Sequence, residues 1–255
     1  FTSRLGFVLA AAGSAVGLGN LWRFPYLAAK YGGGTFLLVY IILAITFGFT
    51  LMIAEIAIGR NTRLSCIGAY RKLDQRFGFL GWLASLVPVI ITPYYCVIGG
   101  WVVKYLVEFV TGNGLQAAGD FYFASFTAAQ LPGVFNSPVI WFVLYVLLNA
   151  VVVLFGVEKG IEKVSRVMMP VLVILSIVIA GYSLTIPGAM DGLKYYLLPR
   201  MEDFSIFTVL AAMGQLFYSM SLAMGIMITY GSYMQKDNIL EHSVTQIEVF
   251  DTGFA

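Results

Sequence analysis

An apolar run near the amino terminus is interrupted at its centre by residues that disfavour helix. The run begins after Arg4, reaches Trp22 and is long enough to cross a bilayer, which takes about 20 apolar residues. Residues 13–20 read Gly-Ser-Ala-Val-Gly-Leu-Gly-Asn, and glycine, serine and asparagine are poor helix formers. A helix broken at membrane depth frees backbone polar groups, which persist only where protein, water or a ligand satisfies them. The interruption therefore predicts a binding site at the membrane midplane, as transporters have.

The composition indicates a protein that crosses the lipid bilayer several times. Hydrophobic residues make up 60% of the chain and charged residues 11%, and the mean hydropathy is +0.87. Soluble proteins have roughly 25% charged residues, so a soluble chain of this length could not bury so much apolar surface. The net charge of +2 gives no indication of a nucleic-acid partner. We predict a polytopic, all-α helical membrane protein.

Seven apolar segments are separated by proline, glycine and charged residues, and they predict six complete crossings and the start of a seventh. They cover residues 5–29, 35–59, 79–110, 138–156, 164–186, 205–234 and 240–255. The sixth segment carries Tyr218, Ser219 and Ser221 at its centre, followed by Gly225. These residues indicate a second break, or else an ordinary helix in which each serine bonds back to a carbonyl one turn earlier.

The basic residues predict the orientation. Lysine and arginine concentrate in cytoplasmic loops, and ten of the 15 basic residues fall on the side of the amino terminus. These ten are Arg4, Arg60, Arg63, Arg71, Lys72, Arg76, Lys159, Lys163, Arg166 and Lys236. We therefore expect a multi-pass protein of the inner (plasma) membrane of the cell with a cytoplasmic amino terminus.

Several sequence blocks closely resemble the neurotransmitter:sodium symporter family, in particular its bacterial amino-acid branch. The blocks are residues 4–10, 13–25, 32–36, 55–60, 93–95, 159–163 and 229–233. The resemblance implies the bacterial leucine transporter fold, which is built from two inverted repeats of five helices with interrupted first and sixth helices. Residues 1–186 then form the first repeat, and residues 187–255 form an extracellular loop, the sixth helix and the start of the seventh.

The resemblance implies two sodium sites. The first would use the carbonyl of Ala15, the side chains of Asn20 and Ser219, and Asp251 on the seventh helix. Sodium is a hard ion that prefers several oxygen ligands, much as calcium does. An intramembrane carboxylate such as Asp251 is costly unless it is paired, although it could also be protonated or solvated. The second site would use the carbonyls of Gly13 and Val16 and further ligands from an eighth helix.

The resemblance also places an amino-acid substrate beside the first sodium ion. Its carboxylate would meet the amides of Leu18 and Gly19, at the positive end of a helix, and the hydroxyl of Tyr95. Gly17 stands where monoamine transporters carry aspartate, which implies a substrate that brings its own carboxylate. The predicted substrate-binding residues are Ala15, Gly17, Leu18, Gly19, Ile91, Tyr95, Tyr218, Ser219, Ser221 and Met224.

Three further positions take roles from the same resemblance. Arg23 and Tyr218 would form an outer gate above the substrate. Glu55 would brace the unwound sixth helix from behind the site. Relatives that need chloride have a serine at the position of Ala255, so we expect this protein to be independent of chloride, with Asp251 supplying the negative charge.

These assignments predict a sodium-coupled symporter of amino acids, with hydrophobic or aromatic side chains, that works by alternating access. The alternative is a membrane sensor that binds amino acids and sodium without transporting them. An enzyme is not expected, because the sequence has neither a catalytic triad nor a metal-binding cluster and His242 is its single histidine.

Overall fold

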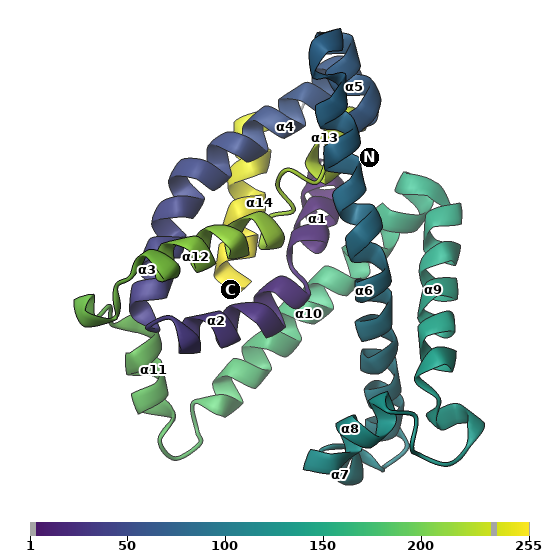
Figure 1. The fold of residues 1–255 in the computed structure, drawn as a ribbon, viewed down its shortest axis with the longest axis vertical. Coiled ribbons are helices and arrows are strands. Elements are labelled where there is room, and N and C mark those ends of the chain that lie inside the picture. The colour runs from purple at the N-terminus through teal and green to yellow at the C-terminus, as the bar shows by residue number, and fades with distance from the viewer. Residues whose placement is uncertain (1–3, 236–238, 255) are drawn as a thin grey trace. The chain divides into compact units, whose positions relative to one another are not determined.

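The chain is helical throughout the part that is described. The computed structural model describes residues 4–235 and 239–254, and no strand occurs within them. The first apolar segment consists of α1 (Arg4–Ala15), the π-helix η1 (Gly19–Arg23) and α2 (Phe24–Lys30). Its two halves, Gly6–Ala15 and Gly19–Lys30, meet at an angle of 42°, and the bend is visible between α1 and α2 in Figure 1. The predicted break in the first helix is confirmed.

The second and third apolar segments are long helices separated by a short one. The second comprises α3 (Gly34–Leu43), the π-helix η2 (Ala44–Gly48) and α4 (Phe49–Thr62). Next follow α5 (Cys66–Leu73), η3 (Gln75–Phe77) and the 33-residue α6 (Gly78–Val110). Burial raises the pKa of the Cys66 thiol, which favours an unreactive thiol, and both Cys66 and Cys96 are free of disulfides.

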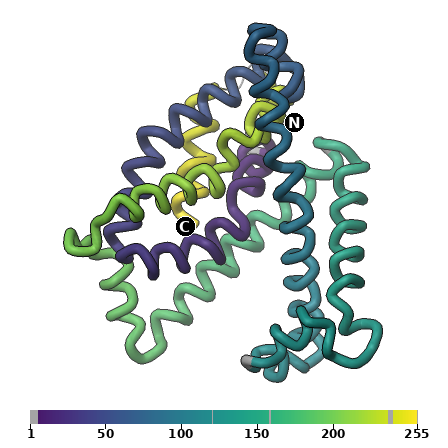
Figure 2. Tube along the Cα trace, viewed as in Figure 1, coloured from purple at the N-terminus to yellow at the C-terminus, as the bar shows by residue number. Residues whose placement is uncertain are grey.

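The remaining helices run from the loop after α6 to the end of the described chain. They are α7 (Gly114–Ala117), α8 (Asp120–Thr127), η4 (Val134–Asn136), α9 (Pro138–Leu154), η5 (Val157–Glu162), α10 (Lys163–Ser183), α11 (Ala189–Leu197), η6 (Met201–Asp203), α12 (Ile206–Ser219), α13 (Ile226–Ser232) and α14 (Leu240–Phe254). The break between α12 and α13 confirms the second interruption, and the trace in Figure 2 shows it as an irregular stretch in the green part of the chain.

Three of these helices are long and apolar enough to cross a membrane: Gly34–Thr62, Gln75–Val110 and Lys159–Ser183. The bent pair of α1 and α2 raises the number to four among the described residues. The predicted fourth crossing is the 17-residue α9, and the predicted sixth is divided between α12 and α13. Length alone therefore identifies fewer crossings than the sequence predicts, because broken and short helices fall below a full span.

The chain forms two compact units. The first contains Phe1–Ser85 and Ile161–Ala255, and the second contains Leu86–Gly160. In the first unit, α4 and α13 cross in close contact. A Cβ added at Gly59 would lie 1.9 Å from the carbonyl oxygen of Ile228, and one at Gly231 would lie 2.4 Å from that of Ile56. Glycine is needed at both positions because the two backbones almost touch.

The second unit contains a buried polar cluster. Lys104 on α6 is 3% exposed; it forms an ion pair with Glu108 and donates a hydrogen bond of 2.8 Å to Asn136 Oδ1. The hydroxyl of Tyr122 donates to Glu108 Oε1 at 3.1 Å, and Lys104 Nζ lies 5.4 Å from the ring centre of Trp141. These contacts tie α8, η4 and α9 to the end of α6.

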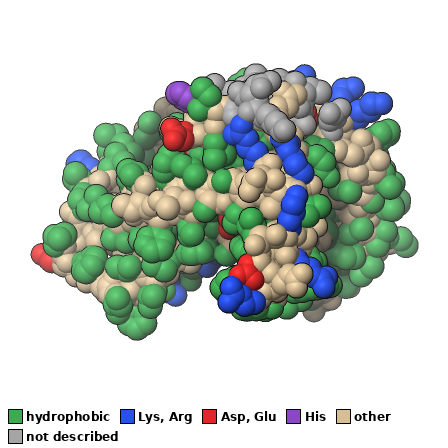
Figure 3. Space-filling model, turned by 90° about the horizontal axis from the view of Figure 1, so that it is seen from above, with side chains coloured by type: hydrophobic (Ala, Val, Ile, Leu, Met, Phe, Trp, Pro, Cys, Tyr) green, Lys and Arg blue, Asp and Glu red, His purple; other side chains and the backbone are tan. Residues whose placement is uncertain are grey.

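Exposed basic side chains follow α4. Arg63, Arg71, Lys72 and Arg76 are exposed, as expected for loops at a membrane surface. Figure 3, seen from above, shows several lysine and arginine side chains close to one another on the face that it displays. The predicted cytoplasmic Lys236 lies outside the described residues.

Candidate functional site

The first break exposes backbone polar groups inside the first unit. The chain bends at Val16 and Gly17 and resumes as a π-helix at Gly19. The amide of Gly17 donates to Asn20 Oδ1 at 3.4 Å, so an amide side chain replaces a helical carbonyl as its acceptor. A Cβ added at Gly17 would meet no atom of the described residues within 4 Å. The backbone therefore faces open space at this point.

The second break is built from left-handed residues. Ser221, Ala223 and Gly225 have φ angles of 54°, 59° and 70°, and such angles cost a non-glycine residue roughly 1–2 kcal/mol. Glu55 Oε1 on α4 accepts a hydrogen bond from the amide of Ala223 at 2.6 Å. Glu55 thus satisfies a backbone group that the break leaves without a helical acceptor. Its other oxygen, Oε2, is buried and has no hydrogen-bond partner among the described residues.

The two breaks touch each other directly. The hydroxyl of Ser221 donates to the carbonyl of Ser14 at 3.4 Å, and Gln215 Nε2 donates to the carbonyl of Gly19 at 2.8 Å. These bonds join groups more than 190 residues apart in the chain. Sequence reasoning did not assign this role to Gln215, although a buried amide in an apolar segment is a signal for it.

A cluster of buried oxygen-bearing side chains lies where the breaks meet α14. Asp251 is 0% exposed, and Asn20 and Ser219 are each 1% exposed. Asp251 Oδ1 accepts hydrogen bonds from Asn20 Nδ2 at 2.9 Å and from Ser219 Oγ at 2.7 Å. Asp251 Oδ2 accepts one from the hydroxyl of Tyr40 at 3.0 Å. Ser219 Oγ also lies 3.1 Å from Asn20 Oδ1.

This cluster fits a hard cation better than a transition metal. Its donors are amide, hydroxyl and carboxylate oxygens, which suit alkali and alkaline-earth ions. Within residues 4–235 and 239–254, no group of three or more His, Cys, Asp or Glu side chains could hold a metal ion. Tyr40 completes the set of side chains around the carboxylate.

Arg23 and Tyr218 are also brought together. The guanidinium carbon of Arg23 lies 4.8 Å from the ring centre of Tyr218, a cation–π contact. A Cβ added at Gly19 would lie 3.3 Å from Tyr218 Cδ1. The tyrosine ring therefore covers the start of η1 and leaves no free space for a side chain at position 19.

The other predicted site residues are spread over both units. Ala15 and Val16 are buried at the end of α1, Leu18 precedes η1, and Met224 lies half-buried in the second break. A Cβ added at Gly13 would lie 3.5 Å from both Met169 Sδ and Ser165 Oγ. Ile91 and Tyr95 lie one turn apart on α6 in the second unit, so their part in the site stays a prediction.

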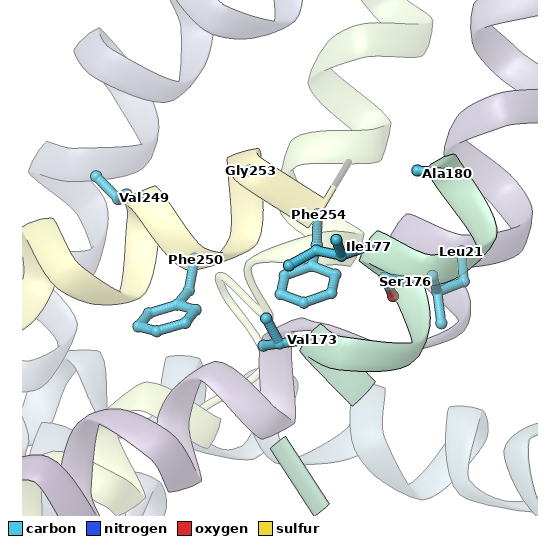
Figure 4. A pocket seen from close by; sticks show the side chains of 9 residues that line it. All are labelled: Leu21, Val173, Ser176, Ile177, Ala180, Val249, Phe250, Gly253 and Phe254. Carbon is cyan, nitrogen blue, oxygen red and sulfur yellow. The ribbon is translucent and has the colours of Figure 1, made fainter. Parts of the chain in front are cut away.

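A separate cavity of about 540 Å³ lies between α10 and α14 and reaches Leu21 (Figure 4). The picture shows the ring of Phe254 beside Val173 and Ile177. Its lining side chains are mostly apolar, and none of the nine is a predicted site residue. This cavity is therefore distinct from the oxygen cluster.

Comparison with known proteins decides the family. A family model described as the Sodium:neurotransmitter symporter family matches residues 1–117 and 113–253. The chain belongs to this symporter family. The interrupted all-α fold is confirmed by the solved structure of MhsT in complex with L-phenylalanine. It matches this chain with a TM-score of 0.89 and 38% identity, over 100% of this chain and 58% of the other.

Two curated relatives are similar along nearly the whole chain. An uncharacterized sodium-dependent transporter of Bacillus subtilis is 38% identical over 97% of this chain and 55% of its own length. Another from Methanocaldococcus jannaschii is 35% identical over 100% of this chain and 53% of its own length. The chain thus spans about half the length of the curated relatives it matches, and these relatives are transporters rather than enzymes.

Proposed function

We propose that the full-length protein is a sodium-coupled symporter of amino acids, with a preference for hydrophobic or aromatic side chains. The observation that carries this proposal is the buried oxygen cluster of Asn20, Ser219 and Asp251 at the junction of two broken helices. Supporting it, the relatives are named sodium-dependent transporters and the MhsT structure contains L-phenylalanine.

Sodium is a substrate of this reaction. Asn20, Ser219 and Asp251 would hold one ion together with the carbonyl of Ala15. The carbonyls of Gly13 and Val16 would contribute to a second ion. The negative charge of Asp251 supports cation binding, because a buried carboxylate is stabilised by a partner of opposite charge.

The amino acid would occupy the space in front of the first break. No atom of the described parts of the chain lies within 4 Å of a Cβ placed at Gly17, which supports room for a ligand there. The amides of Leu18 and Gly19 and the hydroxyl of Tyr95 would receive its carboxylate. Its side chain would contact Ile91, Tyr218, Ser221 and Met224, where methionine can adapt to bulky groups.

Coupling would arise from shared contacts. Both sodium and substrate bind where the two breaks meet, so each favours the conformation that the other needs. Arg23 and Tyr218 would close the outer side of the substrate site. Glu55 would hold the second break in its non-helical conformation through the hydrogen bond from the amide of Ala223. The first and sixth helices would then rock against the other helices in alternating access. The protein would lie in the inner (plasma) membrane with its amino terminus in the cytoplasm.

Uptake into proteoliposomes tests the proposal. The full-length protein should accumulate radiolabelled phenylalanine when an inward sodium gradient is imposed and should stop when the gradient is dissipated. Asn20→Ala should weaken sodium-dependent binding while the protein remains folded. A protein that binds phenylalanine in the presence of sodium but never accumulates it would instead be the sensor. Sodium dependence unchanged in Asn20→Ala would refute the assignment of the first sodium site.

A further inference from the structure

A second cavity in the first unit is lined by two residues that each carry a buried polar atom without a hydrogen-bond partner among the described residues. The cavity has a volume of about 520 Å³ and lies between the α3–η2–α4 segment and α14. Glu248 and Thr252 line it from α14, one helical turn apart. Glu248 Oε1 and Thr252 Oγ1 are buried, and neither has a hydrogen-bond partner within the described parts of the chain. We call this cavity the α3–α14 groove.

The opposite wall of the groove is apolar. Ile41, Ala44, Ile45 and Phe49 line it. Ala44 and Ile45 belong to the π-helix η2, and π-helical turns occur frequently at functional sites. The side chain of Ile45 is 66% exposed, so the groove opens at the surface of this part of the chain. A molecule dissolved in the bilayer could enter it directly.

The chemistry of the groove selects its occupant. A buried carboxylate oxygen without a partner is costly, and a cationic donor is its best partner. A bare metal ion would need more oxygen ligands than Glu248 and Thr252 supply. The groove is within the usual volume range of small-molecule sites, and its walls are mostly apolar. An organic cation with an apolar body matches both walls of the groove, the polar one formed by Glu248 and Thr252 and the apolar one opposite.

We propose that the α3–α14 groove binds amphiphilic amines from the bilayer. The side chains of Glu248 and Thr252 turn toward the groove and accept hydrogen bonds from the ammonium group, and the apolar body packs against Ile41, Ile45 and Phe49. This site is separate from the oxygen cluster around Asp251, whose carboxylate oxygens already accept hydrogen bonds from Asn20, Ser219 and Tyr40.

Binding of radiolabelled dodecylamine to the full-length protein in nanodiscs tests the proposal. The specific signal is the part displaced by excess unlabelled dodecylamine, and dodecanol is the uncharged competitor of equal length. Glu248→Gln should weaken binding at least about tenfold, the loss expected when a charge-assisted hydrogen bond becomes a neutral one. Thr252→Val should weaken it by a smaller factor. Glu241→Gln, at an exposed acid on the same helix, should leave it unchanged.

A second variant keeps the test decisive if Glu248→Gln does not fold. Ile45→Trp fills the mouth of the groove without changing its charge and should also abolish specific binding. Equal affinity in the wild type and in a folded Glu248→Gln or Ile45→Trp variant would overturn the proposal, as would equally effective competition by dodecanol. Displacement of the amine by sodium, measured against potassium buffer, would place the amine at Asp251 and would also overturn it. Absence of saturable dodecylamine binding in the wild type would also overturn the proposal.

Discussion

Replacing Asp251 with asparagine isolates the charge of the oxygen cluster from its shape. Asparagine has nearly the same volume and keeps one oxygen that can accept the hydrogen bonds from Asn20 and Ser219, now 2.9 and 2.7 Å long. The hydroxyl of Tyr40, which donates at 3.0 Å, can rotate and accept a bond from the new amide. We therefore expect the Asp251→Asn protein to fold.

The expected loss of sodium affinity follows from the removed charge. Two unit charges about 4 Å apart interact by about 4 kcal/mol at an effective dielectric constant of 20. Because Asp251 is 0% exposed without a bound ion, the cost of burying its carboxylate is the same with and without sodium and does not change the affinity. The amide oxygen of asparagine still coordinates the ion as a dipole. If it retains about a third of the attraction, the net loss is about 2.7 kcal/mol, or about a hundredfold in sodium affinity.

Binding of radiolabelled phenylalanine at a series of sodium concentrations measures this affinity. The half-saturating sodium concentration should rise about a hundredfold in Asp251→Asn and stay constant in the matched control Glu241→Gln, whose acid is exposed near the start of α14. A folded Asp251→Asn protein with the wild-type sodium response would show that the carboxylate does not face the ion.

Three further predictions concern packing, the buried ion pair and anion dependence. Gly59→Ala should lower the melting temperature, because overpacking against Ile228 costs about 1–3 kcal/mol of folding stability. The control Gly181→Ala, whose added Cβ meets no described atom within 4 Å, should leave the melting temperature unchanged. Equal melting temperatures of the two variants would contradict the close crossing of α4 and α13. Lys104→Met should lower the free energy of unfolding by about 3–5 kcal/mol because it leaves the buried Glu108 carboxylate without its ion-pair partner, and adding Glu108→Gln should restore part of this loss. Denaturant titration of the double-mutant cycle measures both effects. Strictly additive losses would show that the two residues are not coupled. Replacing chloride with gluconate should leave sodium-driven uptake unchanged, and a collapse of uptake would show that Asp251 does not supply the required negative charge.

The break in the first helix was predictable because it is local, whereas the sequence left the break in the sixth helix open against an ordinary helix. Residues 13–20 combine three glycines with serine and asparagine, and these residues oppose helix wherever they stand together. Ser221 and Ala223 were harder, since neither residue type favours a left-handed conformation. Their φ angles of 54° and 59° are supported by the bond from the amide of Ala223 to Glu55, which lies 168 residues earlier in the chain.

The functional site was harder to predict from the sequence, because it depends on contacts between segments that are distant in the chain. Asn20, Ser219 and Asp251 were placed together through the family resemblance, and the structure brings them within hydrogen-bond distance. The bond from Gln215 to the carbonyl of Gly19 depends on how two broken helices approach each other, which no local pattern encodes. Glu248 was not singled out for the same reason, because its cavity forms only when α14 packs beside η2.

The two breaks support each other, and this explains why they occur together. A single broken helix would leave carbonyls and amides without partners in hydrocarbon. Here Ser221 in the second break donates to the carbonyl of Ser14, and Glu55 accepts from the amide of Ala223. Gln215 on α12 adds a second hydrogen bond to the carbonyl of Gly19, which also accepts from the amide of Phe24. Ligands therefore need to stabilise only the groups that remain. Because those groups come from both segments, any movement of one broken helix alone would strand polar atoms of the other, so the two are expected to move as a pair.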